Sequence, residues 1–128
     1  MSTSAKAKGN KWENQIAAMQ KSVGNYAQES RASKGLFDVV VFGRKIATCI
    51  QAHAWKANRW FRSKQERLDM EHFYDKYWEY VYVEVWKKEP PGKIRIFKFI
   101  GDEWWEEPEL NEYWQEIYDK MFGERTTR

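Results

Sequence analysis

The chain has 128 residues, of which 42% are hydrophobic, 17% aromatic and 32% charged, with a formal net charge of +3. This composition suits one domain with one hydrophobic core, and the sequence contains no apolar stretch of about 18 residues, which excludes a transmembrane helix. Residues 1–66 carry 12 Lys/Arg against 4 Asp/Glu, and residues 67–128 carry 10 against 15, so the two halves have charges of +8 and −5. A basic half favours a polyanionic partner, although charges also scatter unevenly on ordinary small proteins.

The first thirty residues predict a tail, a helix and a short strand. Residues 1–9 are small, basic and polar, which is typical of a flexible tail, and they lack the apolar segment of a signal peptide. Asn10 and Glu13 have the spacing of a capping box, and apolar residues recur at helical spacing after them, so we expect a helix over 11–22. Residues 26–30 alternate weakly and predict a strand.

The next segment predicts a hairpin and then a helix. The valine-rich residues 36–42 and the apolar residues 46–55 read as two strands joined by the turn Gly43-Arg44-Lys45. Ser63 is a suitable helix N-cap, with Glu66 three residues later. Cys49 is the single cysteine and cannot form an internal disulfide, so a reducing, cytoplasmic location is expected.

The second half predicts a second hairpin and a final helix. Residues 79–87 and 93–100 read as strands around a Pro-Pro-Gly turn, residues 101–108 as an acidic aromatic loop, and residues 109–122 as an amphipathic helix. The element order is therefore α-β-β-β-α-β-β-α, which favours an α/β fold with a mixed five-stranded sheet flanked by helices. The acidic, aromatic C-terminal region would lie on the core, form a dimer contact, dock another protein or cover a sheet edge.

Polar residues flank the first hairpin where its strands look buried. Gln51 and His53 are two residues apart, so in a strand their side chains share one face. A hairpin centred on residue 44 brings Asp38 opposite residues 50–51, and oxygen ligands that converge in this way suit a hard cation such as Mg²⁺. Glu13 is a candidate third oxygen donor. The alternative is that these residues are a strand-edge acid, a satisfied buried amide, a structural histidine and a helix cap.

Three segments carry a resemblance to a known family: KGNKWENQIAAM with Glu13, SRASKGLFDVVVFG with Asp38, and CIQAHAW with Gln51 and His53. They resemble the PD-(D/E)xK nuclease superfamily and are similar to the archaeal Holliday junction resolvases. The resemblance implies a restriction-endonuclease-like domain over residues 10–100, with 101–128 as an addition.

For function, the resemblance implies an endonuclease that hydrolyses phosphodiester bonds of DNA, branched DNA included, as a homodimer. It implies a catalytic set of Glu13, Asp38, Gln51 and His53. It also implies an Mg²⁺ or Mn²⁺ ion held by Asp38, Gln51, the main-chain carbonyl of Ala52, and Glu13.

The resemblance departs from the family pattern at His53, which stands where the family has a lysine. His53 would then act as a base, serve as a ligand that favours Mn²⁺, or mark a site that has lost its chemistry and only binds DNA. Lys34 and Lys56 are other candidates for the missing lysine, although Lys56 would face the opposite side of a continuous strand.

The segment HAWKANRWFRSK, residues 53–64, combines four cations with aromatic residues and contains no acid. Cations of this kind contact phosphates, and an aromatic ring stacks on exposed bases. The alternative is a loop whose aromatic residues fill the core. The predicted DNA-contacting residues are Arg31, Lys34, Arg44, Lys45, Lys56, Arg59, Trp60, Arg62 and Lys64. A rival to DNA binding is a protein-interaction adaptor that uses the acidic, aromatic C-terminal region.

Overall fold

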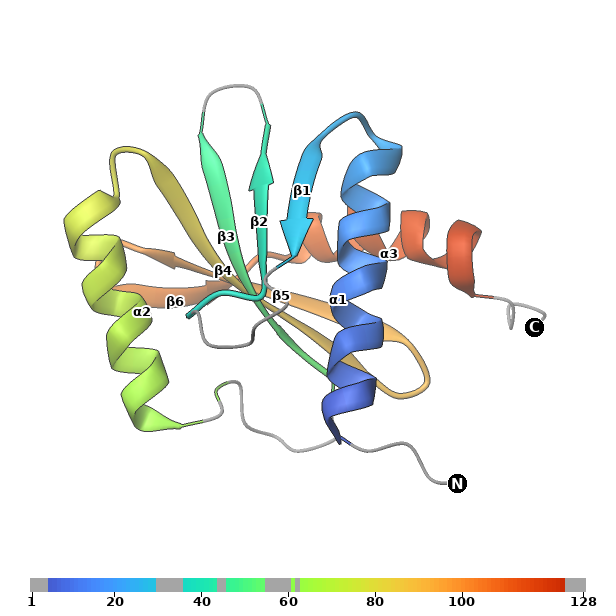
Figure 1. Cartoon of the computed structure of the whole chain (residues 1–128), viewed down its shortest axis with the longest axis horizontal. Coiled ribbons are helices and arrows are strands. Elements are labelled where there is room, and N and C mark those ends of the chain that lie inside the picture. The colour runs from blue at the N-terminus through green and yellow to red at the C-terminus, as the bar shows by residue number, and fades with distance from the viewer. Residues whose placement is uncertain (1–4, 30–35, 44–45, 55–60, 62, 124–128) are drawn as a thin grey trace.

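The structure is a computed structural model that describes residues 5–29, 36–43, 46–54, 61 and 63–123, with side chains from Lys11 onward. Within these residues, six strands form one sheet in the order β1-β2-β3-β4-β5-β6, and three helices pack on it (Figure 1). The predicted α/β class is thus confirmed, with one strand more than the predicted five.

The elements are α1 (Ala5–Ser22), β1 (Tyr26–Glu29), β2 (Val39–Phe42), β3 (Ala47–His53), α2 (Lys64–Tyr77), β4 (Val81–Glu89), β5 (Lys93–Ile100), β6 (Glu103–Glu106) and α3 (Pro108–Phe122). Neighbouring strands are antiparallel except for β3 and β4, which are parallel. A parallel pair needs a crossover connection, and α2 provides it. None of the described helices is long and apolar enough to cross a membrane.

The extra strand, β6, lies in the segment predicted as a loop. It pairs antiparallel with β5, from Phe97 opposite Glu106 to Ile100 opposite Glu103. The glycine and acidic residues around it are typical of a loop, but Trp104 and Trp105 favour a strand once a partner strand is available.

The helix starts agree with prediction at α2 and differ at α1. Ser63 caps α2, since its hydroxyl accepts a hydrogen bond from the backbone N–H of Glu66 at 3.1 Å, as predicted. Helix α1 begins at Ala5 instead of residue 11, so the interpretation of Asn10 as its N-cap is wrong, and residues 5–9 of the predicted tail belong to the helix. Alanine at positions 5 and 7 favours this extension, and Gly9 is not sufficient to end the helix.

Two hydrophobic clusters lie on the two faces of the sheet. On one face α1 and α3 cover a cluster that includes Trp12, Ile50, Trp86, Trp114 and Tyr118. On the other face α2 covers a cluster built from β3, β4, β5 and the segment before β2, namely Phe37, Cys49, Met70, Val83, Val85, Phe97 and Phe99. In Figure 1, α1 and α3 lie toward one end of the sheet and α2 toward the other.

Helix α3 also closes an edge of the sheet. Strand β6 ends opposite Phe97, and beyond that point β5 bonds to amide side chains of α3. The backbone N–H groups of Ile94 and Ile96 donate to Gln115 Oε1 at 2.8 Å and to Asn111 Oδ1 at 2.6 Å. These side chains take the place of a strand partner for β5. Of the alternatives left open for the last helix, the structure shows the covering of a sheet edge.

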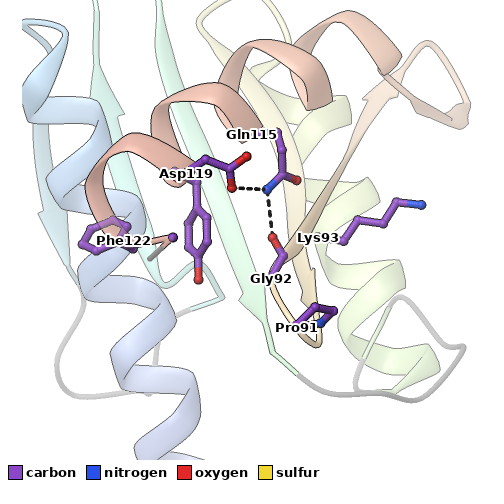
Figure 2. Close-up of a pocket in the computed structure, with 8 residues that line it drawn as sticks. Pro91, Gly92, Lys93, Gln115, Asp119 and Phe122 are labelled. Carbon is purple, nitrogen blue, oxygen red and sulfur yellow. Dashed lines mark hydrogen bonds between the residues drawn. The ribbon is translucent and has the colours of Figure 1, made fainter. Parts of the chain in front are cut away.

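Gln115 also ties α3 to the turn between β4 and β5. Its Nε2 donates to the carbonyl of Gly92 at 2.9 Å and to Asp119 Oδ1 at 3.2 Å (Figure 2). The pocket in Figure 2 lies between this turn and α3, and Tyr118 and Phe122 complete its wall. None of the predicted site residues lines this pocket. The hydrogen bond from Gln115 to Gly92 holds α3 against the turn between β4 and β5.

Candidate functional site

Asp38 joins the start of β2 to the end of β3. It lies one residue before β2 and is only 5% exposed. Its backbone N–H donates to the carbonyl of Ile50 at 2.8 Å, and its Oδ2 accepts from the backbone N–H of Ala52 at 2.7 Å. The hairpin therefore brings Asp38 to residues 50–52, as the position of the turn predicts.

Gln51 and His53 lie side by side on one face of β3, and both are fully buried. Gln51 Nε2 donates to the carbonyl of Leu36 at 3.2 Å, and Gln51 Oε1 lies 2.8 Å from His53 Nε2. An amide oxygen can only accept, so His53 Nε2 carries the hydrogen in this contact. The pair of hydrogen bonds fixes the orientation of both side chains.

Lys87 is a residue that the sequence interpretation missed. In the parallel pairing of β3 with β4 it lies directly opposite His53, so both side chains project from the same face of the sheet. Lys87 is 1% exposed, and its Nζ lies 3.3 Å from Glu89 Oε2. The available signal is its phase, because Lys87 follows Val83 and Val85 on one face of a strand that is buried from Val83 to Lys87.

An ion-pair network continues from Lys87 across β5. Arg95 lies 3.3 Å from Glu89 and contacts both carboxylate oxygens of Glu106, at 3.0 and 2.7 Å. Partial burial by itself would raise the pKa of Glu89, but hydrogen bonds from Lys87 and Arg95 bring that pKa below its usual value. The hydrogen bond from Arg95 likewise lowers the pKa of Glu106. Lys87 is therefore held at one end of a row of alternating charges.

Glu13 belongs to a different element from these residues. It is half buried on α1, which covers the face of the sheet opposite to Gln51 and His53. Its neighbour Trp12 anchors the helix there by donating from Nε1 to the carbonyl of Trp86 at 3.0 Å. Within the part of the chain that the structure describes, no three His, Cys, Asp or Glu side chains gather closely enough to hold a metal ion.

Most of the predicted DNA-contacting residues lie outside the described residues. Lys64 is the exception, and it is exposed at the first position of α2. The other eight are Arg31, Lys34, Arg44, Lys45, Lys56, Arg59, Trp60 and Arg62.

Comparison with known proteins gives a similarity at the level of the fold. No family model matches the chain, and no curated protein matches it. Among solved structures, the chain is similar to Hjc of Archaeoglobus fulgidus, a Holliday junction resolvase from an archaeal hyperthermophile. The TM-score is 0.53 at 17% sequence identity, over 81% of this chain and 86% of that chain. The chain thus shares the overall fold of this protein.

Proposed function

We propose that the chain is a metal-dependent endonuclease that hydrolyses phosphodiester bonds in branched DNA. The observation that supports this most is the hydrogen bond between the Asp38 carboxylate and the backbone N–H of Ala52, in a chain of this fold. Gln51 lies beside it and is itself hydrogen-bonded to Leu36 and His53. A strand-edge aspartate would be solvated, whereas Asp38 is buried at the point where β2 and β3 meet.

The donor chemistry at this point fits a hard divalent cation. The carboxylate of Asp38, the amide oxygen of Gln51 and the main-chain carbonyl of Ala52 are oxygen ligands of the kind that Mg²⁺ and Mn²⁺ prefer. Glu13 is the proposed fourth donor. When bound, such a cation supplies a nucleophilic water at neutral pH and offsets charge that develops on the phosphate.

The nitrogen-bearing side chains have separate proposed roles. His53, oriented by Gln51, accepts the proton of the attacking water at Nδ1, because its Nε2 carries the hydrogen that Gln51 Oε1 accepts. Lys87, paired with Glu89, lies beside it and attracts the anionic phosphate. The family's lysine would then be replaced by two residues, a histidine on β3 and a lysine on the adjacent position of β4.

A second candidate is a protein of the same fold that binds DNA without cutting it. Two observations favour this alternative. Asp38, Gln51 and His53 are buried, and Asp38 is the single carboxylate among these three side chains. In both cases we propose a homodimer, because a four-way junction presents two symmetric strands to a two-fold assembly.

The test is a cleavage assay on labelled four-way junction, flap, duplex and single-stranded DNA, with Mg²⁺, Mn²⁺ or EDTA. Asp38→Asn is compared with Asp69→Asn, a control on the exposed side of α2. Cleavage that needs metal and disappears only in Asp38→Asn supports the nuclease, and the preferred DNA identifies its substrate. Binding of DNA without cleavage under any of these conditions supports the second candidate. Indifference to all DNA at low salt rejects both and favours a protein-interaction role.

A further inference from the structure

Two aromatic side chains are exposed together on the outer strands of the sheet. Tyr26 on β1 pairs with Phe42 on β2, and their ring centroids are 5.9 Å apart. Tyr26 is 61% exposed and Phe42 is 47% exposed. Large apolar side chains that lie together in solvent are more informative than single ones, because they mark contact surfaces.

This pair lies on the same face of the sheet as Gln51 and His53. Helix α1 covers the other face of these strands through Ala27 and Val41, while α2 packs against β4. Phe42 pairs with Ala47, and Gln51 lies four positions after Ala47 along β3. At about 3.3 Å per residue, the aromatic pair lies about 13 Å from Gln51 along the direction of the strand.

The spacing and the charge favour a nucleic acid strand as the occupant of this face. A strand that rises about 3.4 Å per nucleotide covers the same distance in about four nucleotides. The first half of the chain, which contains these strands, has a charge of +8, and Arg44 and Lys45 follow directly after Phe42 and Gly43 in sequence. Strand alternation directs Glu29, the acid of β1, to the opposite face from Tyr26.

We propose that Tyr26 and Phe42 form a stacking surface for unpaired bases of DNA, about four nucleotides from the bond that is cut. The proposal rests on the proposed function for the identity of the polymer, and it adds that the substrate has an unpaired segment on one side of the site. Rings stack on any base, so recognition here depends on accessible bases and is independent of sequence. A fully paired duplex hides its base faces and gains nothing from this surface.

The experiment measures the affinity for labelled oligothymidine, a forked DNA and a blunt duplex in EDTA, by fluorescence anisotropy. The test variant is the double substitution Tyr26→Ala with Phe42→Ala, and Tyr26→Ala alone is a milder second variant. Tyr26→Phe keeps the ring. Tyr82→Ala is the matched control, since Tyr82 is 44% exposed on the opposite face of the sheet. Urea unfolding and sedimentation are measured for each protein.

We expect the double variant to bind oligothymidine and the fork about 5- to 100-fold more weakly, with duplex affinity unchanged. Tyr26→Phe and Tyr82→Ala should bind as the unmodified chain does. Equal weakening for duplex DNA, or no weakening for oligothymidine, overturns the proposal. A shift from dimer to monomer in the double variant also overturns it, because the face is then an interface between copies. Stacking without cleavage in Mg²⁺ or Mn²⁺ supports the stacking surface, and it rejects both the nuclease and the stated distance to a cut bond.

Discussion

Replacing Asp38 by alanine or by asparagine separates its structural contribution from its chemical one. The carboxylate accepts a 2.7 Å hydrogen bond from the buried N–H of Ala52. Alanine removes the acceptor and leaves that N–H without its partner. Asparagine has nearly the same shape and still offers an oxygen, so it removes the charge and keeps an acceptor for Ala52.

The expected magnitudes follow from the burial of this bond. A hydrogen bond to a charged group contributes about 1.5–3 kcal/mol, and a buried N–H left unsatisfied costs a similar amount. Asp38→Ala should therefore lower the free energy of unfolding by about 2–3 kcal/mol, and Asp38→Asn by under about 1 kcal/mol. With a urea m-value of about 2 kcal/mol per molar, the alanine variant should unfold at a midpoint about 1–1.5 M lower.

Urea unfolding followed by tryptophan fluorescence gives these midpoints, with Asp69→Ala as the surface control, expected within about 0.5 kcal/mol of the unmodified chain. Cleavage should be lost in both Asp38 variants despite their different stabilities. Equal midpoints for Asp38→Ala, Asp38→Asn and the unmodified chain would refute the reasoning about the Ala52 hydrogen bond. Cleavage retained by Asp38→Asn would refute the role of the charge.

Three further predictions concern the neighbouring groups. Lys87→Gln should reduce cleavage about 100-fold or more while DNA binding persists. Lys88→Gln, on the opposite face of the sheet, should not change cleavage. Equal effects of the two variants would contradict the role of Lys87 at the phosphate. Because Arg95 lowers the pKa of Glu106, this pair stabilises the fold above the ordinary glutamate pKa of about 4.3, and the contribution disappears as pH falls through the lower pKa of the folded state. Urea midpoints measured from neutral to acid pH should therefore decline less steeply in Glu106→Gln, and an unchanged slope would contradict the pairing. Gln115→Ala should lower the free energy of unfolding by about 1–3 kcal/mol in urea, because the N–H of Ile94 loses its acceptor, and an unchanged midpoint would show that water replaces the amide.

The features that were predictable from sequence depend on short-range patterns. Strand β2 ends at Phe42 opposite Ala47, where β3 begins, and the register that follows brings Asp38 to the end of β3. The N-cap at Ser63 is a local hydrogen bond within four residues. Alternation and capping are encoded within a few neighbouring residues, so a single sequence is sufficient to predict them.

The features that were missed depend on partners far away in the chain. Strand β6 exists because β5 offers an edge beside it, although its own segment has loop composition. The amides of Asn111 and Gln115 belong to a helix, yet their function is to complete a sheet. Polar residues of this kind look like an ordinary solvated helix face until the neighbouring edge is known.

Consecutive lysines at the end of β4 show how the fold divides similar residues between two environments. Lys87 projects beside His53, while Lys88 projects to the other face, where its Nζ donates to Gln15 Oε1 at 2.6 Å and lies 5.0 Å from the centroid of the Trp12 ring. Burial, together with repulsion from Lys11, lowers the pKa of Lys88 to about 8. The pleat alone separates the two amines, but only the parallel pairing of β3 with β4 brings one of them opposite His53. That pairing requires the long connection through α2, so a lysine 34 positions away in sequence becomes the neighbour of the hairpin's polar residues. A motif search confined to β3 finds a histidine where a lysine is expected, whereas the folded sheet provides both groups on one surface.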